Sequence, residues 1–251
     1  MKNLFSGFLM AISMFTIIPM PYKAWRDEAV KHMMKLYPIV GLVVGLINYL
    51  VYIIVDYFNL STILIATFTM ITPFIITGML HLDGYMDVCD ALLSRRDQKE
   101  KIRILKDPNT GAFAVISLGI LFLIDFAATY TLVDSKTNIL GIILVPIISR
   151  SLMAIMLLKK ETMKESSLGS YFKKGTGKLD IYILYIFLII SSISMVILID
   201  IKAGLVPIFM IISAILSVNK STKELGGMSG DSAGYGLVIA EVVGILCLSI
   251  I

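Results

Sequence analysis

Three aspartates recur at helical spacing between His81 and Asp90. Asp83, Asp87 and Asp90 stand at i, i+4 and i+7, so a helix turning about 100° per residue would place them within about 60° of one another. Like charges at this spacing destabilise a helix unless a counter-charge neutralises them. Mg²⁺ would do so, because it takes a few carboxylates and completes its shell with water and substrate phosphate. We therefore predict a phosphoryl-transfer site, with a solvated acidic surface as the alternative.

Two further residues extend this candidate site. Asp97 would join the same face if the helix continued, which makes it a fourth candidate metal ligand. His81 could act in catalysis as a base or a ligand, although a lone histidine at a membrane boundary can equally be a structural polar residue. His32 has no comparable cluster around it, so we expect a structural role for it.

A proline turn at 106–113 leads into an apolar run. Exposed amides at the start of a helix bind anions, so Lys106 and Asp107, together with Arg96 just upstream, are candidates for substrate binding. Ordinary turn and cap chemistry is the alternative explanation of this segment.

A glycine-rich loop at 226–234 stands directly before the last apolar run. Its glycines could bring backbone amides close to phosphate, and Asp231 could bind metal or a ribose hydroxyl. It lacks the Walker lysine pattern, which excludes a P-loop nucleotide hydrolase. A purely structural loop is the alternative, and the candidate binding residues here are Gly227, Ser229, Gly230 and Asp231.

The elements that must position these residues are membrane helices. Apolar residues make up 57% of the 251 positions, charged residues make up 16%, and the mean hydropathy is +0.89. The apolar residues fall into blocks of about 17–23, the length that crosses a bilayer as a helix. The alternation over ten residues that is typical of a membrane β-barrel is not visible in the sequence. We predict an all-α, polytopic membrane protein with residues 1–251 in one domain and seven spans near 36–56, 60–80, 112–133, 139–158, 181–200, 203–219 and 235–251.

The first apolar stretch, 4–20, ends in Pro19 and Pro21 and is followed by basic residues. We predict an interfacial or re-entrant helix here. A signal peptide is less compatible with the sequence, because no small-residue cleavage site follows.

The basic residues predict the orientation, because they accumulate in cytoplasmic loops. Nineteen of the 22 lie before the first firm span or in the loops 81–111, 159–180 and 220–234, whereas only Lys136 and Lys202 lie in the opposite turns. These loops are therefore predicted to face the cytoplasm in the cell (plasma or inner) membrane. An eight-span alternative, in which 4–20 crosses, fits the charge distribution less well.

Three charged residues inside the predicted spans are functional candidates, because burying charge in lipid is costly. They are Asp125, Arg150 and Glu241, and Arg150 could be compensated by a substrate phosphate or by a carboxylate such as Glu241. The net charge of +4 is explained by topology and by anionic lipid, so we expect no nucleic-acid partner. Cys89 and Cys247 indicate neither a disulfide framework nor a cysteine metal site.

Taken together, these segments resemble the cobalamin synthase family, also called adenosylcobinamide-GDP ribazoletransferases. Residues 81–90 are similar to its hallmark His-Leu-Asp-Gly-x-x-Asp-x-x-Asp, and 226–231 to its Gly-Gly-x-Thr-Gly-Asp, with Ser229 in place of Thr. Ala91 stands where the family often has Gly. Further similarity lies at 15–21, in the Pro-x-x-Gly-x-x-x-Gly pattern within 37–45, and at 96–97, 105–107 and 111–113.

The resemblance implies that α-ribazole, or its 5′-phosphate, attacks the cobinamide-side phosphorus of adenosylcobinamide-GDP and expels GMP. It also implies Mg²⁺ as cofactor, a lipid bilayer as surroundings, and is compatible with a homo-oligomer. Two alternatives are weighed against it. A CDP-alcohol phosphotransferase would have Ala and Arg where Asp87 and Val88 stand, and an ion or small-solute transporter would show internal repeats that are not visible here.

Overall fold

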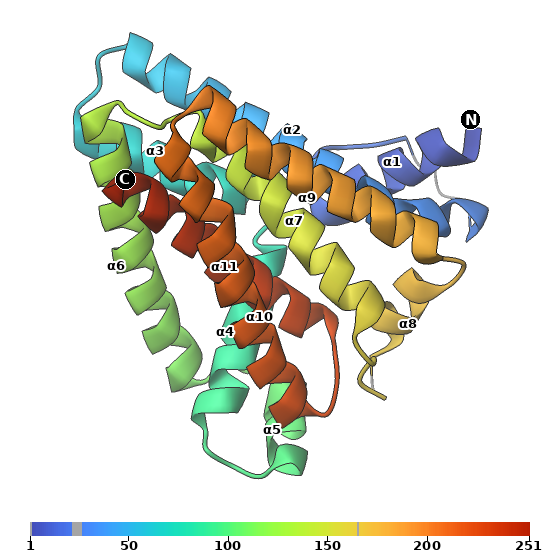
Figure 1. Ribbon diagram of the computed structural model, residues 1–251. Helices are drawn as coiled ribbons and strands as arrows, with labels where there is room; N and C mark the ends of the chain where they lie inside the picture. The colour runs from blue at the N-terminus through green and yellow to red at the C-terminus, as the bar shows by residue number, and fades with distance from the viewer. Residues whose placement is uncertain (1, 22–26, 165) are drawn as a thin grey trace.

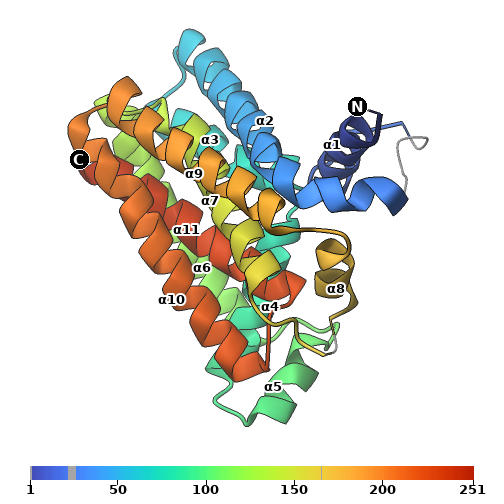
Figure 2. The same cartoon turned by 45° about the vertical axis from the view of Figure 1, so that its right-hand side comes forward.

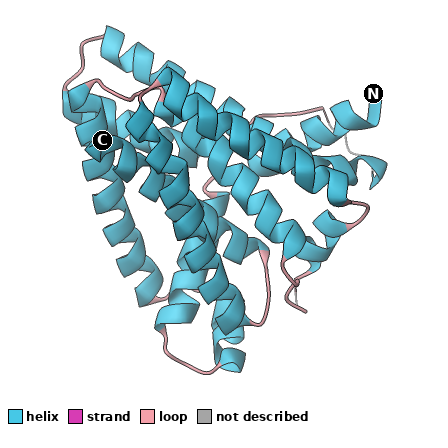
Figure 3. Ribbon diagram, in the orientation of Figure 1, coloured by secondary structure: helices cyan, strands magenta, loops and turns pink. Residues whose placement is uncertain are grey.

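The computed structural model describes residues 2–21, 27–164 and 166–251, and it is built of helices (Figure 3). Within these ranges the only extended pairing is an isolated bridge between Thr162 and Met228. The prediction of an all-α protein is thus confirmed. Lys23 and Arg26, which were counted among the basic residues before the first span, lie outside the described residues.

Six helices of the described chain are long and apolar enough to cross a membrane. Each corresponds to a predicted span, but several extend beyond the apolar run because polar residues form their first or last turn. The 3₁₀ turns η2 (Asp27–Ala29) and η3 (Ile201–Gly204) precede the first and fifth of them. The six are α2 (Val30–Tyr57), α6 (Ala112–Ser135), α7 (Gly141–Lys159), α9 (Lys178–Leu198), α10 (Leu205–Leu225) and α11 (Gly230–Ile250).

The span predicted over 60–80 is a single helix that ends four residues earlier than predicted. It forms α3 (Thr62–Ile76), which is followed after a bend of 89° by α4 (Leu80–Leu93). Gly78 and Met79 both adopt left-handed backbone conformations, with φ of 59° and 61°, and this ends the helical hydrogen-bond ladder. Among the described residues only α3 and α4 together are long enough for a seventh crossing, and α4 packs against α11 and α6.

The N-terminal stretch forms α1 (Lys2–Phe15), which packs against α2. Its 14 residues are fewer than the about 20 needed to span a bilayer. The backbone amide of Ile17 donates to the carbonyl of Ile76 at 2.8 Å, which joins the end of α1 to the end of α3. A helix is therefore confirmed here, while its position at the interface stays a prediction.

Helix α7 lies at the centre of the bundle, between α2, α9 and α11 (Figure 1). It is buried along nearly its whole length. In contrast, α6, α9 and α10 expose large aliphatic side chains such as Leu123, Ile197 and Leu216. A water-soluble protein would not expose so many, whereas lipid chains would cover them.

The polar segments gather at one end of the bundle (Figures 1 and 2). This end holds the short helices α5 (Gln98–Leu105) and α8 (Ser167–Lys173) and the turn between α10 and α11. The α2–α3, α6–α7 and α9–α10 connections and the C-terminus lie at the opposite end. The three loops predicted to share one side of the membrane are therefore together.

Candidate active site

The three aspartates of α4 lie on one face of the helix, as their spacing predicts. Asp83 is exposed, and Asp87 and Asp90 are half-buried. The other face of the helix is buried among apolar side chains, including Leu82 and Val88. The burial of this apolar face holds α4 in place and leaves its carboxylates turned away from the packed interior.

A fourth carboxylate, Asp231, reaches this face from α11. A β-carbon placed on Gly84 would lie 2.9 Å from the Cα of Asp231, and one on Gly234 would lie 3.0 Å from the carbonyl oxygen of His81. The two helices approach so closely only because both positions are glycine. The two motifs lie about 140 residues apart in the sequence. This packing of α4 against α11 brings them together into one site.

The electrostatics of Asp87 reflect this convergence. Helix α4 stands outside the six spanning helices, and partial burial together with the charges of Asp83, Asp231 and Asp90 raises the pKa of Asp87 to about 6. Within the described chain none of these four carboxylates takes part in an ion pair. The site therefore holds a concentrated negative charge that lacks a protein counter-charge.

The N-terminus of α6 meets the same site. Gly111 is its N-cap residue, and the carboxylate of Asp90 lies where a side chain at Gly111 would begin. The partial positive charge of a helix N-terminus stabilises a nearby carboxylate. Three helices, α4, α6 and α11, therefore meet around the aspartates.

Aromatic residues fix the orientation of α4, and the sequence analysis did not identify them as part of the site. The hydroxyl of Tyr85 donates to the carbonyl of Ser117 at 3.2 Å, and its ring stacks on Tyr235 at 5.7 Å. Tyr85 stands two residues after Asp83, which on a helix is the opposite face. That offset was the available signal that Tyr85 packs inward.

His81 lies in the packed interior and not on the aspartate face. It is 5% exposed, and its Nε2 shares a 2.7 Å hydrogen bond with the hydroxyl of Tyr37 from α2. Phe15 stacks beside it, at 6.2 Å between ring centroids. These contacts favour a positioning role, in which His81 fastens the start of α4 to α2, while its role as a base or ligand stays a prediction.

The glycine-rich loop uses its amides within the protein. Gly227 adopts φ of 148°, and its amide donates to the carbonyl of Thr222 at 2.9 Å. The amide of Met228 donates to the backbone carbonyl of Glu161 at 2.8 Å. Ser229 caps α11 by accepting from the amide of Ser232 at 3.1 Å. These contacts give Gly227 and Ser229 structural roles and leave Gly230 and Asp231 as the loop residues nearest the aspartates of α4.

The segment after α4 does not extend the aspartate face of that helix. Helix α4 ends at Leu93, so Asp97 does not continue its face; the Asp97 carboxylate accepts from the amide of Glu100 at 2.9 Å and caps α5. Asp107 accepts two hydrogen bonds from Asn109, at 3.0 Å and 2.7 Å, and these lower its pKa. Arg96 and Lys106 are exposed at the same end of the bundle.

Arg150 is not at the aspartate site. It is 1% exposed and forms an ion pair with Glu241, whose carboxylate also accepts from the hydroxyl of Ser149 at 2.7 Å. Of the two compensating partners that the sequence allowed, the structure therefore provides the carboxylate. The ion pair links α7 to α11, while a substrate-binding role for Arg150 stays a prediction.

Comparison with known proteins places this arrangement in a family. A family model described as cobalamin-5-phosphate synthase matches residues 7–249. The chain belongs to the cobalamin-5-phosphate synthase family. Proteins named adenosylcobinamide-GDP ribazoletransferase are similar to it: one of Clostridium botulinum (strain Alaska E43 / Type E3) is 49% identical and covers 98% of this chain and 97% of its own, and one of Clostridium perfringens (strain SM101 / Type A) is 43% identical over the full length of both.

A more distant relative with the same name, from Lachnoclostridium phytofermentans, is 31% identical and covers 93% of this chain and 89% of its own. No solved structure matches the chain. The match to the cobalamin-5-phosphate synthase family includes α4 and the loop before α11, so the whole aspartate site lies within it. It favours this family over both alternatives, the CDP-alcohol phosphotransferases and the transporters.

Proposed function

We propose that this chain is an adenosylcobinamide-GDP ribazoletransferase in cobalamin (vitamin B12) biosynthesis. It would transfer the adenosylcobinamide phosphate group of adenosylcobinamide-GDP to α-ribazole or α-ribazole 5′-phosphate, and release GMP. The names of its relatives support this activity. The structural observation that carries it is the convergence of Asp83, Asp87 and Asp90 with Asp231 from a second helix.

The aspartate site fits Mg²⁺ as the cofactor. Its donors are carboxylate oxygens, and burial together with the charges of Asp83, Asp231 and Asp90 raises the pKa of Asp87; a divalent cation would compensate these charges. Within the described residues no three His, Cys, Asp or Glu side chains are already grouped to hold a metal. Mg²⁺ does not require such a group, because it keeps several waters and is completed by substrate phosphates. Asp83, Asp87 and Asp90 are the residues that would hold it.

In the reaction a hydroxyl oxygen of the acceptor ribose forms a bond to the cobinamide-side phosphorus and loses its proton to solvent. The bond from that phosphorus to the bridging oxygen breaks, and this oxygen leaves with GMP. Bound Mg²⁺ would supply charge neutralisation at the diphosphate. Asp231, which faces the α4 carboxylates, would contact a ribose hydroxyl of the donor. Arg96 and Lys106, exposed at the same end, would attract the departing nucleotide phosphate.

We also propose that the active site faces the cytoplasm from the cell membrane. The excess of basic residues at the end that carries α5 and α8 supports this orientation. The bilayer would cover the exposed aliphatic side chains of α6, α9 and α10. The corrinoid substrate would then meet the protein at the membrane surface.

An assay of the purified protein tests the proposal. With adenosylcobinamide-GDP, α-ribazole and Mg²⁺, we expect GMP and the joined corrinoid to appear together, and removal of Mg²⁺ by a chelator to stop both. Asp83→Asn, Asp87→Asn and Asp90→Asn should each lower turnover by about 100-fold or more, since each removes charge from an electrostatic site. Asp134→Asn, on an exposed residue at the far end of α6, is the matched control. Full turnover in all three α4 variants would refute the assignment.

A further inference from the structure

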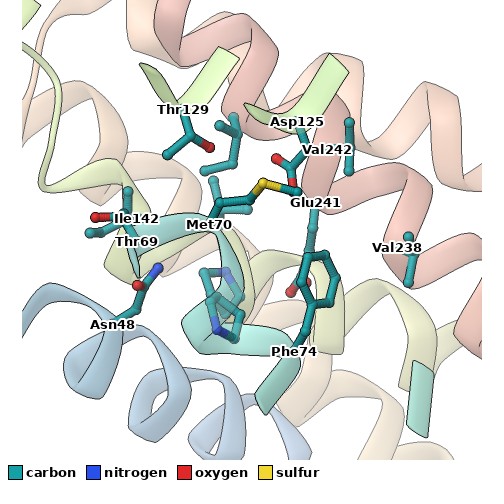
Figure 4. A pocket seen from close by; sticks show the side chains of 14 residues that line it. Asn48, Thr69, Met70, Phe74, Asp125, Thr129, Ile142, Val238, Glu241 and Val242 are labelled. Atoms are coloured by element: carbon teal, nitrogen blue, oxygen red, sulfur yellow. The ribbon is translucent and has the colours of Figure 1, made fainter. Parts of the chain in front are cut away.

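A second polar region lies inside the bundle, where α2, α3, α6, α7 and α11 surround a cavity of about 40 Å³ (Figure 4). None of the residues that line it belongs to α4, so it is separate from the aspartate site. A cavity needs about 10–15 Å³ to hold one water molecule, so this one has room for an ion with a water. Its position between spanning helices makes polar lining residues costly unless they have a ligand.

Several buried oxygen atoms line this cavity. Asn48 of α2 is 4% exposed, and within the described chain its Oδ1 has no hydrogen-bond partner. Asp125 of α6 is 6% exposed, and among the described residues its carboxylate has no ion pair. The hydroxyl of Thr69 donates its proton to the carbonyl of Ile65 at 2.8 Å, which leaves its lone pairs available. Thr129, one helical turn after Asp125, adds a further hydroxyl.

The charges around the cavity do not balance. Glu241 also lines it, but its negative charge is compensated by Arg150. An ionised Asp125 would carry a negative charge that no cation of the described residues compensates. A monovalent cation would neutralise it, whereas a divalent cation would leave an excess positive charge of similar cost in the membrane interior.

We propose that this cavity binds one Na⁺. The available donors are carboxylate, amide and hydroxyl oxygens, which are the ligands of hard cations. The ion would join α2, α3 and α6, and through Glu241 it would also contact the ion pair that links α11 to α7. Asn48 supplies the carbonyl oxygen and Asp125 the charge.

Binding of ²²Na⁺ to the purified protein in detergent tests the proposal, with choline chloride keeping the ionic strength constant. We expect saturable binding of about one ion per chain, and a higher Tm in NaCl than in choline chloride because the ion binds only the folded state. Asp125→Asn should weaken binding by about 100-fold or more, since it removes the charged partner of a buried ion. Thr129→Val, which keeps the shape of the side chain, should weaken it less.

Asp134→Asn is the control, because it removes an exposed carboxylate from the same helix. It should leave both ²²Na⁺ binding and the Na⁺-dependent rise in Tm unchanged. If Asp125→Asn does not fold, the wild-type protein and Thr129→Val still decide the question. The proposal is overturned if the wild type binds no ²²Na⁺ and has the same Tm in both salts. It is equally overturned if stability depends on pH but not on Na⁺, because the cavity would then hold a proton on Asp125.

Discussion

The carboxylate of Asp90 on α4 lies in the space that a side chain at Gly111, the N-cap of α6, would occupy. This contact places an aspartate against the positive end of a helix dipole and fixes the distance between two helices of the site. Gly111 is therefore required because it has no side chain, and not because of its backbone flexibility.

We predict that Gly111→Ala lowers turnover by about 100-fold, because a displacement of about 1 Å at a catalytic group has an effect of that size. The added methyl group must push Asp90 away from its position. Gly119→Ala, farther along α6, is the control, since a β-carbon there would have nothing within 4 Å. Steady-state assays of the two purified variants decide the matter. Equal turnover in both would mean that the position of Asp90 is not needed.

Gly227→Ala and Asp231→Asn should separate the two roles of the loop before α11. A β-carbon on Gly227 would lie 2.5 Å from the amide nitrogen of Met163, and φ of 148° is strained for alanine. We therefore expect Gly227→Ala to lower yield and Tm without changing the KM for adenosylcobinamide-GDP in the enzyme that survives. Asp231→Asn should keep its Tm and lose activity. A raised donor KM in a fully stable Gly227→Ala protein would instead restore the phosphate-binding role predicted from sequence.

The helical face of aspartates could be predicted from sequence because it depends only on the 3.6-residue period. The sharp bend between α3 and α4 could not, because besides Gly78 it depends on Met79 adopting φ of 61°, a conformation that a methionine gives no local reason to expect. The apolar run over 60–80 therefore indicated a helix four residues longer than α3 at its end.

Contacts between segments that lie far apart in the sequence could not be predicted either. The approach of Gly84 to Asp231 depends on how α4 packs against α11, so the two motifs were found separately but could not be joined. Arg150 and Glu241 were both singled out as buried charges, yet sequence alone allowed a phosphate as the partner of Arg150. Their ion pair follows from the packing of α7 against α11.

Cysteine labelling should establish the orientation of the bundle. In a background in which Cys89 and Cys247 are replaced by serine, we expect Lys99→Cys and Lys174→Cys to resist an impermeant thiol reagent in intact cells. Both should react in inside-out vesicles, because they lie at the basic end of the molecule.

Lys202→Cys, in the exposed η3 turn at the opposite end, is the control and should label in intact cells. The reverse pattern at all three positions would overturn the proposed cytoplasmic face. Labelling of Lys99→Cys and Lys174→Cys on different sides would contradict the shared end of α5 and α8.

The Arg150–Glu241 pair leads to the last prediction. Glu241→Gln removes the carboxylate that directly contacts the buried guanidinium, so the free energy of unfolding should fall by about 3–5 kcal/mol. The double variant Arg150→Met with Glu241→Gln removes both charges and should recover most of this loss. Breaking the exposed pair between Lys136 and Asp56 by Asp56→Asn is the control, and it should lower the free energy of unfolding far less, because water and salt screen an exposed pair.

The same variants bear on the Na⁺ site, because they change the charge around the cavity. In Glu241→Gln the charges of Asp125 and Arg150 cancel, so the Na⁺-dependent rise in Tm should disappear. In the double variant Asp125 is again the uncompensated charge, so the Na⁺ effect should return. Thermal unfolding of both variants in NaCl and in choline chloride measures this. A Na⁺ effect of equal size in the single and the double variant would mean that Asp125 and Arg150 do not share one electrostatic environment.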